Sequence, residues 1–324
     1  MNDSPIRIGF IGAGLFARDV HVPSLLSLED TYQIVAVQSR TRDSAEKLAE
    51  IVPYAVDITT DMDALLARDD IDVVALLLPI PLLPDAVEKA LKSGKHVVSE
   101  KPIAPDVATG KRLLALPRAD GQQWMVAENW RYEAMYQQAG EIVDSGVLGA
   151  PIVFNWAIHI AVNPDNKYYH TAWRRSGDFP GGFLLDGGVH HIAAIRQILG
   201  EVDSVTAMVT QAKDDLPPAD TLVATLRMKS GALGTYTVTY AATGQMPDML
   251  DIVCAKGSMR VNREVLKAVH GEEQIMPVPQ KPDGVSEEYR ALALTLNGGS
   301  AHINTPEQAL QDVAVLEAML ESAR

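Results

Sequence analysis

Residues 6–17, IRIGFIGAGLFA, are the most informative segment of this sequence. Its first half is an apolar run, and glycines follow at positions 12 and 14. A helical pattern then continues to about Leu28, and a second apolar run covers Gln33–Gln38. This order of strand, turn, helix and strand within ~30 residues is the context in which a glycine-rich turn binds a nucleotide. We therefore predict a nucleotide-binding β-α-β unit at the start of the chain.

The small residues of this turn have separate physical roles. Gly12 permits the tight turn, Gly14 lets the backbone approach a pyrophosphate, and Ala17 allows close packing of helix against strand. The helix N-terminus offers N–H groups and the positive end of the helix dipole to the anion. The alternative is a glycine-rich turn that binds nothing, which the two flanking strands disfavour. We expect cofactor contacts from Gly12, Ala13, Gly14, Leu15 and Phe16.

The end of the second strand, Gln38-Ser39-Arg40-Thr41-Arg42, bears on the choice of nucleotide. Enzymes that prefer NAD usually carry an acidic residue there, which accepts hydrogen bonds from the ribose, and this segment has none. Ser39 can hydrogen-bond a 2′-phosphate, and Arg40 can pair with it or stack on the adenine. The alternative is a solvated arginine pair at a helix start. The pattern favours NADP over NAD as the cofactor.

The alternation of helices and apolar strands continues through the first third of the chain. It predicts helices at residues 44–51, 61–67, 81–93 and 106–116, and strands at residues 73–78 and 96–98. Such alternation is typical of a parallel sheet that helices cover on both faces. We therefore expect an α/β fold, a Rossmann doubly wound parallel sheet, over residues 1–123.

A lysine follows the predicted strand at residues 96–98, in the run His-Val-Val-Ser-Glu-Lys-Pro that ends at Pro102. Polar groups at the carboxyl ends of strands in an open α/β sheet face the ligand crevice. Lys101 is therefore predicted at the reactive end of the nucleotide. The alternative is an ordinary surface lysine, which the apolar neighbours Val97 and Val98 and the rigid exit at Pro102 disfavour.

The sequence pattern changes near residues 119–123. Longer runs with a period of two follow at residues 152–158, 202–210, 220–228, 231–240, 249–255 and 258–261. They predict a large, mostly antiparallel open sheet with helices on one side, in a C-terminal α+β domain over residues 124–303. The Pro- and Glu-rich segment 271–287 is predicted to be an exposed loop. A capping box at residues 305–308 starts a last helix within residues 304–324.

A second cluster of reactive side chains follows a glycine pair at positions 181 and 182. Asp186 and His190 lie four residues apart and share a helix face if a helix begins at Asp186. The alternatives are that Asp186 only caps this helix and that His190 is a packed first-turn residue. A metal site formed by Asp186, His190 and His191 is disfavoured, because adjacent histidines point to different sides of a helix and no fourth ligand stands out.

Composition argues against several classes of function. The chain has 324 residues, enough for two domains, and its 47% hydrophobic and 22% charged residues are a globular composition. The formal charge of −14 argues against nucleic acid or an anionic membrane surface as a partner. The one cysteine, Cys254, permits no disulfide within the chain. No signal peptide or transmembrane segment is visible, so we expect a cytoplasmic protein.

Taken together, these motifs resemble those of one known family, the glucose–fructose oxidoreductase / inositol dehydrogenase / rhizopine catabolism (Gfo/Idh/MocA) family of NAD(P)-dependent oxidoreductases. The resemblance covers essentially the whole chain. The features that carry it are Gly12-Ala13-Gly14, His21-Val22-Pro23, Glu100-Lys101-Pro102, Asn129-Trp130-Arg131, Gly181-Gly182, Asp186-Gly187-Gly188-Val189-His190 and the helix that ends at residues 317–323.

The resemblance implies roles for particular residues. It implies that Lys101, Asp186 and His190 are catalytic, with His190 as general acid/base in hydride exchange between the nicotinamide and a secondary alcohol or carbonyl of a sugar, polyol or related small molecule. It also implies that the last helix packs back on the Rossmann domain and that the open sheet forms a homo-dimer or tetramer. The further cofactor contacts it implies are Pro79, Glu100, Lys101, Asn129, Trp173 and Arg174.

Departures from the family pattern bear on the substrate. The exit of the predicted strand at residues 73–78 reads Leu78-Pro79-Ile80, where the family more often has Thr-Pro-Asn. Leu83 stands where the family more often has a histidine, and Ala193 where it often has an aspartate. The less polar pocket that these residues predict suits a second hypothesis, an NADPH-dependent reductase of a non-sugar carbonyl or a conjugated double bond. A third hypothesis is a non-catalytic nucleotide sensor or scaffold, against which the predicted catalytic set argues. Substrate contacts are expected near Trp156, His159, Asn163, Tyr168, Tyr169 and His170.

Overall fold

The computed structural model describes residues 4–177, 179–244, 248–275 and 283–323. The chain divides into two compact units. One consists of Met1–Asn129 with Asp283–Leu310, and the other of Trp130–Pro282 with Gln311–Arg324. The first unit thus runs past the boundary expected at residue 123. The C-terminal segment that joins it begins at Asp283, before the expected residue 304, and the division between the units then falls inside the last helix.

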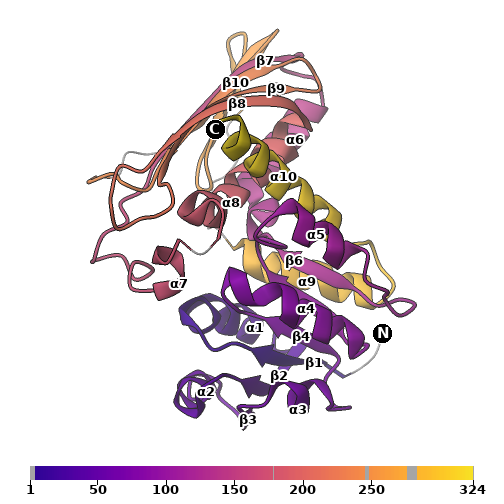
Figure 1. Ribbon diagram of the computed structural model, residues 1–324. Helices are drawn as coiled ribbons and strands as arrows, with labels where there is room; N and C mark the ends of the chain where they lie inside the picture. Colours follow the sequence, from indigo (N-terminus) through magenta and orange to yellow (C-terminus); the bar gives the residue numbers. More distant parts are fainter. Residues whose placement is uncertain (1–3, 178, 245–247, 276–282, 324) are drawn as a thin grey trace. The chain divides into compact units, whose positions relative to one another are not determined.

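A six-stranded sheet forms the centre of the first unit (Figure 1). All neighbouring strands in it pair parallel, in the order β3-β2-β1-β4-β5-β6. The order reverses direction beside β1, as in doubly wound dinucleotide-binding sheets, and this confirms the predicted Rossmann sheet. The strands are β1 (Ile6–Ile11), β2 (Tyr32–Gln38), β3 (Asp57–Thr59), β4 (Val73–Leu76), β5 (His96–Glu100) and β6 (Trp124–Ala127).

Helices surround this sheet, and short polar side chains cap several of them. The side chains of Thr41, Asp61 and Asp106 accept hydrogen bonds from backbone N–H groups in the first turns of α2, α3 and α5. Among the described residues, no helix is long and apolar enough to cross a membrane. The helices of this unit are η1 (Ala17–His21), α1 (Val22–Leu26), α2 (Arg42–Ala49), α3 (Met62–Leu66), η2 (Ile80–Leu82), α4 (Leu83–Lys92), α5 (Val107–Leu114) and α9 (Gly284–Leu296).

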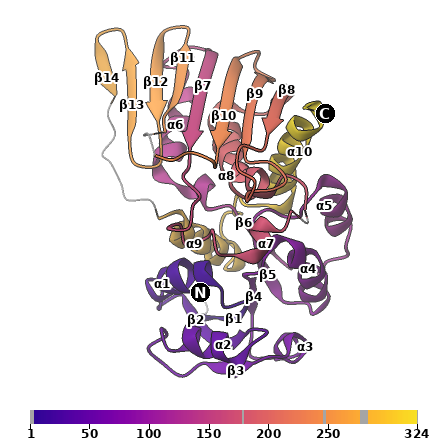
Figure 2. The ribbon, with the colours of Figure 1, turned by 60° about the vertical axis from the view of Figure 1, so that its left-hand side comes forward.

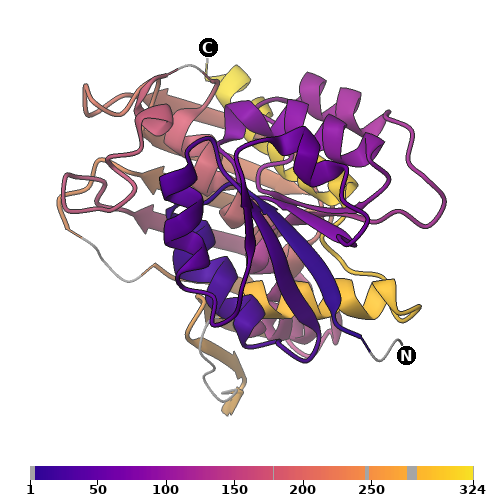
Figure 3. The same ribbon diagram turned by 90° about the horizontal axis from the view of Figure 1, so that it is seen from below.

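Helix α9 belongs to the first unit although it comes late in the sequence (Figure 3). Val285, Tyr289 and Leu292 recur at helical spacing and are at most 4% exposed, because they pack against η1, α1 and β6. The predicted exposed loop over residues 271–287 is therefore wrong at its end, where α9 begins. It is also wrong near its start, where Glu273–Ile275 form a short strand, β14. Residues 276–282 lie outside the described residues.

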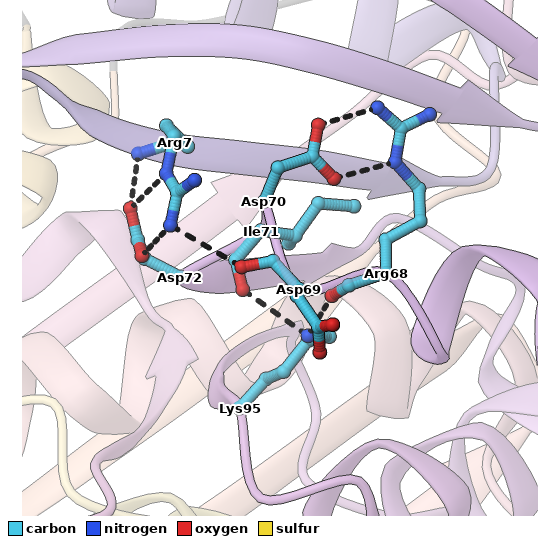
Figure 4. Close-up of polar contacts among 7 residues, drawn as sticks. All are labelled: Arg7, Arg68, Asp69, Asp70, Ile71, Asp72 and Lys95. Atoms are coloured by element: carbon cyan, nitrogen blue, oxygen red, sulfur yellow. Dashed lines mark hydrogen bonds and ion pairs between the residues drawn. The ribbon is translucent and has the colours of Figure 1, made fainter.

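Ion pairs join the amino ends of the parallel strands (Figure 4). Arg7 on β1 donates two side-chain hydrogen bonds to the Asp72 carboxylate, at 3.0 and 2.7 Å, just before β4. Arg68 pairs with Asp70 at 2.7 Å, and this hydrogen bond lowers the pKa of Asp70 to about 2. Lys95, just before β5, donates to two backbone carbonyls of the same loop. The charges of Arg7, Arg68, Asp70 and Asp72 are thus neutralised by one another.

An eight-stranded sheet forms the centre of the second unit (Figure 2). Its order is β14-β13-β12-β11-β7-β10-β9-β8. The pair β7 and β10 is parallel, and the other neighbouring pairs are antiparallel, which confirms the predicted mostly antiparallel sheet. The strands are β7 (Pro151–His159), β8 (Val202–Thr210), β9 (Thr221–Met228), β10 (Leu233–Thr239), β11 (Leu250–Cys254), β12 (Gly257–Val261), β13 (Leu266–His270) and β14 (Glu273–Ile275).

The two faces of this second sheet differ in exposure. On the inner face, Trp156 and Tyr236 are at most 1% exposed, and α6 and α8 pack on this side of β12 and β9. On the other face, Met208 is 73% and Leu233 47% exposed. Alternation along each strand therefore sorts inner from outer side chains, as the period of two predicts. The remaining helices are η3 (Asn129–Tyr132), α6 (Ala134–Asp144), α7 (Ala172–Arg175), α8 (Gly182–Leu199) and α10 (Pro306–Ser322).

Candidate functional site

The glycine-rich turn after β1 depends on glycine at position 12 and leaves open space at position 14. Gly12 has φ +108°, a left-handed conformation that favours glycine. A Cβ at this position would stand 2.3 Å from the backbone oxygen of Leu77, so only glycine fits here without a shift of the backbone. A Cβ at Gly14 would meet nothing within 4 Å. The backbone at Gly14 is therefore open to a pyrophosphate, and the turn fits the predicted dinucleotide.

The helix after the turn is irregular in a way that the sequence explains. It contains a π-helical segment, η1, in which the Val22 N–H reaches back to the Ala17 carbonyl. Pro23 follows directly and has no N–H for the carbonyl of Asp19, so the regular ladder is interrupted at this point. Ala17 is 1% exposed, consistent with the close packing predicted for it.

More of the predicted cofactor contacts lie at the same edge of the parallel sheet. Ser39 and Arg40 follow β2, Pro79 follows β4, Glu100 ends β5 and Asn129 follows β6. Parallel strands put their carboxyl ends at one edge, so the fold brings these residues to the edge that carries the glycine turn. Lys101 follows Glu100 directly and is half-buried.

The two arginines after β2 have different surroundings. Arg42 pairs with Glu46 one turn further along α2, at 2.8 Å. Arg40 is exposed and precedes Thr41, the N-cap of α2. The Ser39 N–H donates to a backbone carbonyl of β3, which fixes the exit of the chain from β2. Of the two arginines, Arg42 therefore has a carboxylate partner within α2, and Arg40 has an exposed side chain at the carboxyl edge of the sheet.

His21, for which no role was predicted, lies beside Glu100. His21 is fully buried, and its Nε2 is 2.6 Å from Glu100 Oε1. Its Nδ1 is 2.9 Å from the Tyr289 hydroxyl on α9. These partners are 79 and 268 residues away in sequence. The sequence motif His21-Val22-Pro23 could draw attention to His21. It could not predict that Glu100 and Tyr289 are its partners, because both are distant in sequence.

Helix α8 carries the second group of predicted residues. It begins at Gly182, after the N-cap Gly181 at φ +80°, so the expected start at Asp186 is wrong. A Cβ at Gly182 would stand 2.6 Å from a backbone oxygen, which explains why the glycine pair sets the helix start. Asp186 therefore does not cap the helix. Asp186 and His190 lie one turn apart within α8, as their spacing predicts.

Asp186 is held in place by an arginine that was predicted to contact the cofactor. Arg174 Nε is 2.7 Å from Asp186 Oδ2. The Arg174 guanidinium lies 4.2 Å from the ring centre of Trp173 and 5.0 Å from that of Tyr168, within the range of cation–π attraction. Both side chains of the ion pair are mostly buried. The pair therefore fixes the Asp186 carboxylate in a defined orientation.

Gly187 makes room for a buried tyrosine beside this carboxylate. A Cβ at Gly187 would stand 1.9 Å from the Tyr240 hydroxyl, and Tyr240 is 4% exposed. Burial raises the pKa of Tyr240, and the nearby charge of Asp186 raises it further. Tyr240 is therefore a protonated phenol near Asp186. Nothing in the local sequence around Tyr240 indicates this proximity.

The two adjacent histidines of α8 have different surroundings. The His190 ring stacks on Trp130, with centroids 5.2 Å apart and planes at 16°, and the Arg263 guanidinium lies 5.3 Å from the Trp130 ring centre. His191 is 3% exposed, and its Nδ1 is 2.7 Å from the Tyr236 hydroxyl. His191 therefore belongs to the aromatic core, which counts against the metal site considered for Asp186, His190 and His191.

The side chains expected near a substrate are not equivalent. Trp156 is 1% exposed and packs against Tyr136 and His191. It supports the core, because the alternation along β7 turns it to the inner face of the sheet. Tyr169 donates a hydrogen bond to Asp215, and the exposed His170 bonds to the Pro164 carbonyl. The remaining candidates, His159, Asn163 and Tyr168, are half-buried.

The predicted residues thus fall into two groups. The glycine turn with Ser39, Arg40, Pro79, Glu100, Lys101 and Asn129 belongs to the first unit, and Trp173, Arg174, Asp186 and His190 belong to the second.

Known protein families match both units. Residues 6–128 match the oxidoreductase family with an NAD-binding Rossmann fold, and residues 136–260 match the GFO/IDH/MocA C-terminal domain. The dehydrogenase FPY6 from Fusarium mangiferae is 31% identical over 338 residues, which cover 98% of this chain and 96% of that protein.

Solved structures match the whole fold. An oxidoreductase from Thermotoga maritima is 35% identical with a TM-score of 0.91, over 99% of this chain and 97% of that one. KijD10, a 3-ketoreductase from Actinomadura kijaniata in complex with NADP and TDP-benzene, is 26% identical with a TM-score of 0.85, over 99% and 98% of the two chains. The family matches, the nearly complete overlap and the nucleotide-binding geometry agree: this chain belongs to the GFO/IDH/MocA family of NAD(P)-dependent oxidoreductases.

Proposed function

We propose that this protein transfers a hydride reversibly between a nicotinamide cofactor and a secondary alcohol or carbonyl of a sugar, polyol or related small molecule. The observation that carries the proposal is the pair Asp186 and His190 on α8, with the His190 ring stacked on Trp130. Similarity to the 3-ketoreductase KijD10 supports a ketone as the reacting group. A dTDP-3,4-didehydro-2,6-dideoxy-α-D-glucose 3-reductase from Actinomadura kijaniata, 27% identical over the full chain, supports a sugar as the substrate class.

Three residues have separate tasks in this proposal. His190 takes the hydroxyl proton during oxidation and returns it during reduction, a task that imidazole performs well near neutral pH. Lys101 donates a hydrogen bond to the same oxygen and stabilises the negative charge that develops there. Asp186, fixed by Arg174, supplies a negative charge one turn before His190 and offsets the charge of the lysine.

The residues at the carboxyl edge of the first sheet would hold the cofactor. The open backbone at Gly14 would bind the pyrophosphate, and Glu100, Asn129 and Pro79 would contact the half that carries the nicotinamide. When bound, the nicotinamide supplies the hydride donor or acceptor. Ser39 and the exposed Arg40 favour NADP over NAD. Trp173 and Arg174 are proposed contacts near the nicotinamide.

The exposed face of the second sheet is the proposed contact between copies of the chain. It presents Met208 at 73%, Leu233 at 47% and Val253 at 45% exposure. Val153 on β7 and Val223 on β9, the strands that lie between theirs, are also exposed. Apolar side chains spread in this way over one sheet face make a surface that association removes from water. We therefore propose a homo-dimer or tetramer that forms through this sheet, which sedimentation of the wild type and of Met208→Lys would test.

Fluorescence titration with NADPH and, separately, NADH tests the cofactor assignment. We expect saturable binding of both nucleotides, with NADPH binding tighter. Stronger binding of NADH would keep the oxidoreductase and refute the assignment of Ser39 and Arg40. Failure of both nucleotides to bind would refute the proposed function and make the sensor or scaffold hypothesis the leading one.

His190→Ala tests the catalytic assignment. This variant should bind NADPH as tightly as wild type, while turnover with a sugar or polyol substrate falls by roughly 10²–10⁴-fold, the usual contribution of a general acid or base. His270→Ala, at the end of β13 in the same unit, is the matched control and should keep wild-type turnover. Equal turnover in His190→Ala would remove His190 from the mechanism.

The hypothesis of a non-sugar carbonyl or a conjugated double bond gains no support. It rested on the apolar residues 78–83 after β4 and on Ala193, and the side chains of Leu83 and Ala193 are fully buried. These positions are packed into the faces of α4 and α8, so their apolar character is explained by core packing. A reductive substrate screen that includes enones would still reveal such an activity.

A further inference from the structure

Three buried side chains from distant parts of the sequence form a hydrogen-bonded chain within the first unit. His21 lies between Tyr289 on α9 and Glu100 at the end of β5, at 2.9 Å from the hydroxyl and 2.6 Å from the carboxylate. His21 and Tyr289 are 0% exposed, and the Glu100 side chain is 12% exposed. Hydrogen bonds in such surroundings are stronger than in water and restrict the orientation of each member.

The direction of the two hydrogen bonds follows from the groups at the ends. Burial raises the pKa of Tyr289 well above its ordinary value, and the nearby Glu288, Tyr32 and Glu100 raise it further. Tyr289 is therefore a phenol that can donate to Nδ1, and the Glu100 carboxylate presents acceptor oxygens to Nε2. An imidazole with its proton on Nε2 satisfies both partners in a single tautomer.

His21 also touches a second residue that we expect at the cofactor. Its ring stands edge-on to that of Phe16, with centroids 5.1 Å apart and planes at 82°. Phe16 follows the glycine turn and Glu100 ends β5, so one buried imidazole contacts two neighbouring parts of the proposed nucleotide site. His21 bonds to one oxygen of Glu100, and a carboxylate has a second oxygen that can accept from a ribose hydroxyl.

We propose that Tyr289 and His21 are positioning residues that hold the Glu100 carboxylate for a hydroxyl of the nucleotide. The inference rests on the proposed function, in which Glu100 contacts the cofactor. It makes nucleotide affinity depend on α9, a helix whose sequence is distant from the glycine-rich turn. Tyr289 acts through His21 and does not itself reach the nucleotide.

The test is a double-mutant cycle on the dissociation constant for NADPH. Tyr289→Phe removes one hydroxyl and keeps the packed ring, and Glu100→Gln keeps the shape of the side chain. We expect Glu100→Gln to raise the dissociation constant about tenfold and Tyr289→Phe to raise it about three- to tenfold, the range of one lost hydrogen bond. Relative to Glu100→Gln alone, the double variant should raise the dissociation constant less than about twofold further. The reason is that the effects of residues that act through one another are not additive.

Tyr32→Phe is the matched control. The Tyr32 hydroxyl donates to the Tyr289 backbone carbonyl at 2.7 Å and neighbours the same ring, yet it has no bond to His21. This variant should lower the unfolding midpoint and leave NADPH affinity within about twofold of wild type. A purely structural role for Tyr289 predicts that Tyr289→Phe and Tyr32→Phe behave alike.

The outcomes separate this inference from the proposed function. Additive effects of Tyr289→Phe and Glu100→Gln, or unchanged affinity in Tyr289→Phe, would overturn the relay while Glu100 remains a cofactor contact. Unchanged affinity in Glu100→Gln would remove that contact and the relay with it. Nitrogen-15 NMR of the imidazole gives a readout that needs no nucleotide: we expect the Nε2–H tautomer of His21, and an Nδ1–H tautomer would contradict the relay.

Discussion

The two edges of the parallel sheet in the first unit use charge in opposite ways. At the amino edge, Arg7 and Asp72 come from neighbouring strand ends and bond directly to each other (Figure 4). At the carboxyl edge, Glu100 is held from outside the sheet, by His21 on η1. Charges that neutralise each other contribute stability, whereas a carboxylate held through one oxygen keeps acceptor capacity for a ligand. The comparison therefore separates charges that hold the sheet together from charges that can bind.

The glycines at the two edges differ in the same way. Gly12 at the carboxyl edge and Gly94 before β5 at the amino edge both have positive φ, +108° and +78°. A Cβ at Gly12 would meet the Leu77 oxygen at 2.3 Å, and a Cβ at Gly94 would meet nothing within 4 Å. Gly94 is thus needed only for its backbone conformation, and Gly12 also for the space it leaves.

Gly12→Ala should have the largest effect of the changes considered for this sheet. The added Cβ forces the turn away from Leu77, in addition to the ~1–2 kcal/mol that a left-handed conformation costs a non-glycine residue. We expect NADPH to bind at least about a hundredfold more weakly, because the displaced turn no longer presents its backbone to the pyrophosphate. Fluorescence titration measures this loss, and circular dichroism checks that the variant is folded.

Gly94→Ala is the control at the opposite edge. It introduces a similar conformational cost without a steric clash, so it should lower the unfolding midpoint and leave the NADPH dissociation constant unchanged. Weaker nucleotide binding in both variants would mean that the two edges are not functionally distinct.

Arg40→Ala should have the next largest effect, and only on one nucleotide. The guanidinium is exposed, and its loss removes a charge-assisted hydrogen bond to a 2′-phosphate, so NADPH should bind about tenfold more weakly while NADH is unaffected. The difference should shrink as salt is added, because exposed charges are screened. Arg42→Ala is the matched control: its side chain is engaged with Glu46, and both affinities should stay at the wild-type value.

The carboxyl edge was largely predictable from sequence because its signals are local. The glycine turn, the absent acid after β2 and the lysine after β5 each lie within a few residues of the strand that positions them. The parallel sheet was predictable for the same reason, since apolar strands alternate with capped helices. The start of α8 was missed because the glycine pair at positions 181 and 182 sets it, four residues before the expected Asp186.

The residues that pack beneath the carboxyl edge, on α9, were not predictable in that role, because it depends on contacts between segments distant in sequence. Val285, Tyr289 and Leu292 have helical spacing that could have revealed α9, but the Pro- and Glu-rich residues before them favoured a loop. Even if the helical spacing had predicted α9, it could not have predicted that α9 packs beside η1 and β6. The role of Tyr289 beside His21 depends on that packing. In the second unit, the position of Tyr240 beside Gly187 likewise depends on a contact between segments distant in sequence.

Asp72→Asn should have the smallest effect and should act on stability alone. The Arg7–Asp72 pair is partly exposed, and such pairs stabilise weakly, so we expect a melting temperature lower by about 2 °C and an unchanged NADPH dissociation constant.

The hydrogen bond from Arg7 lowers the pKa of Asp72 in the folded protein, against the opposing effect of burial. The pair therefore contributes fully above the unfolded-state pKa of ~3.9, and its contribution is lost as the pH falls through the folded-state value. The difference in melting temperature between wild type and variant should accordingly be constant from pH 8 to 5 and shrink below pH ~4. A difference that grows in acid, or any loss of nucleotide affinity, would show that the amino edge does more than hold the strands together.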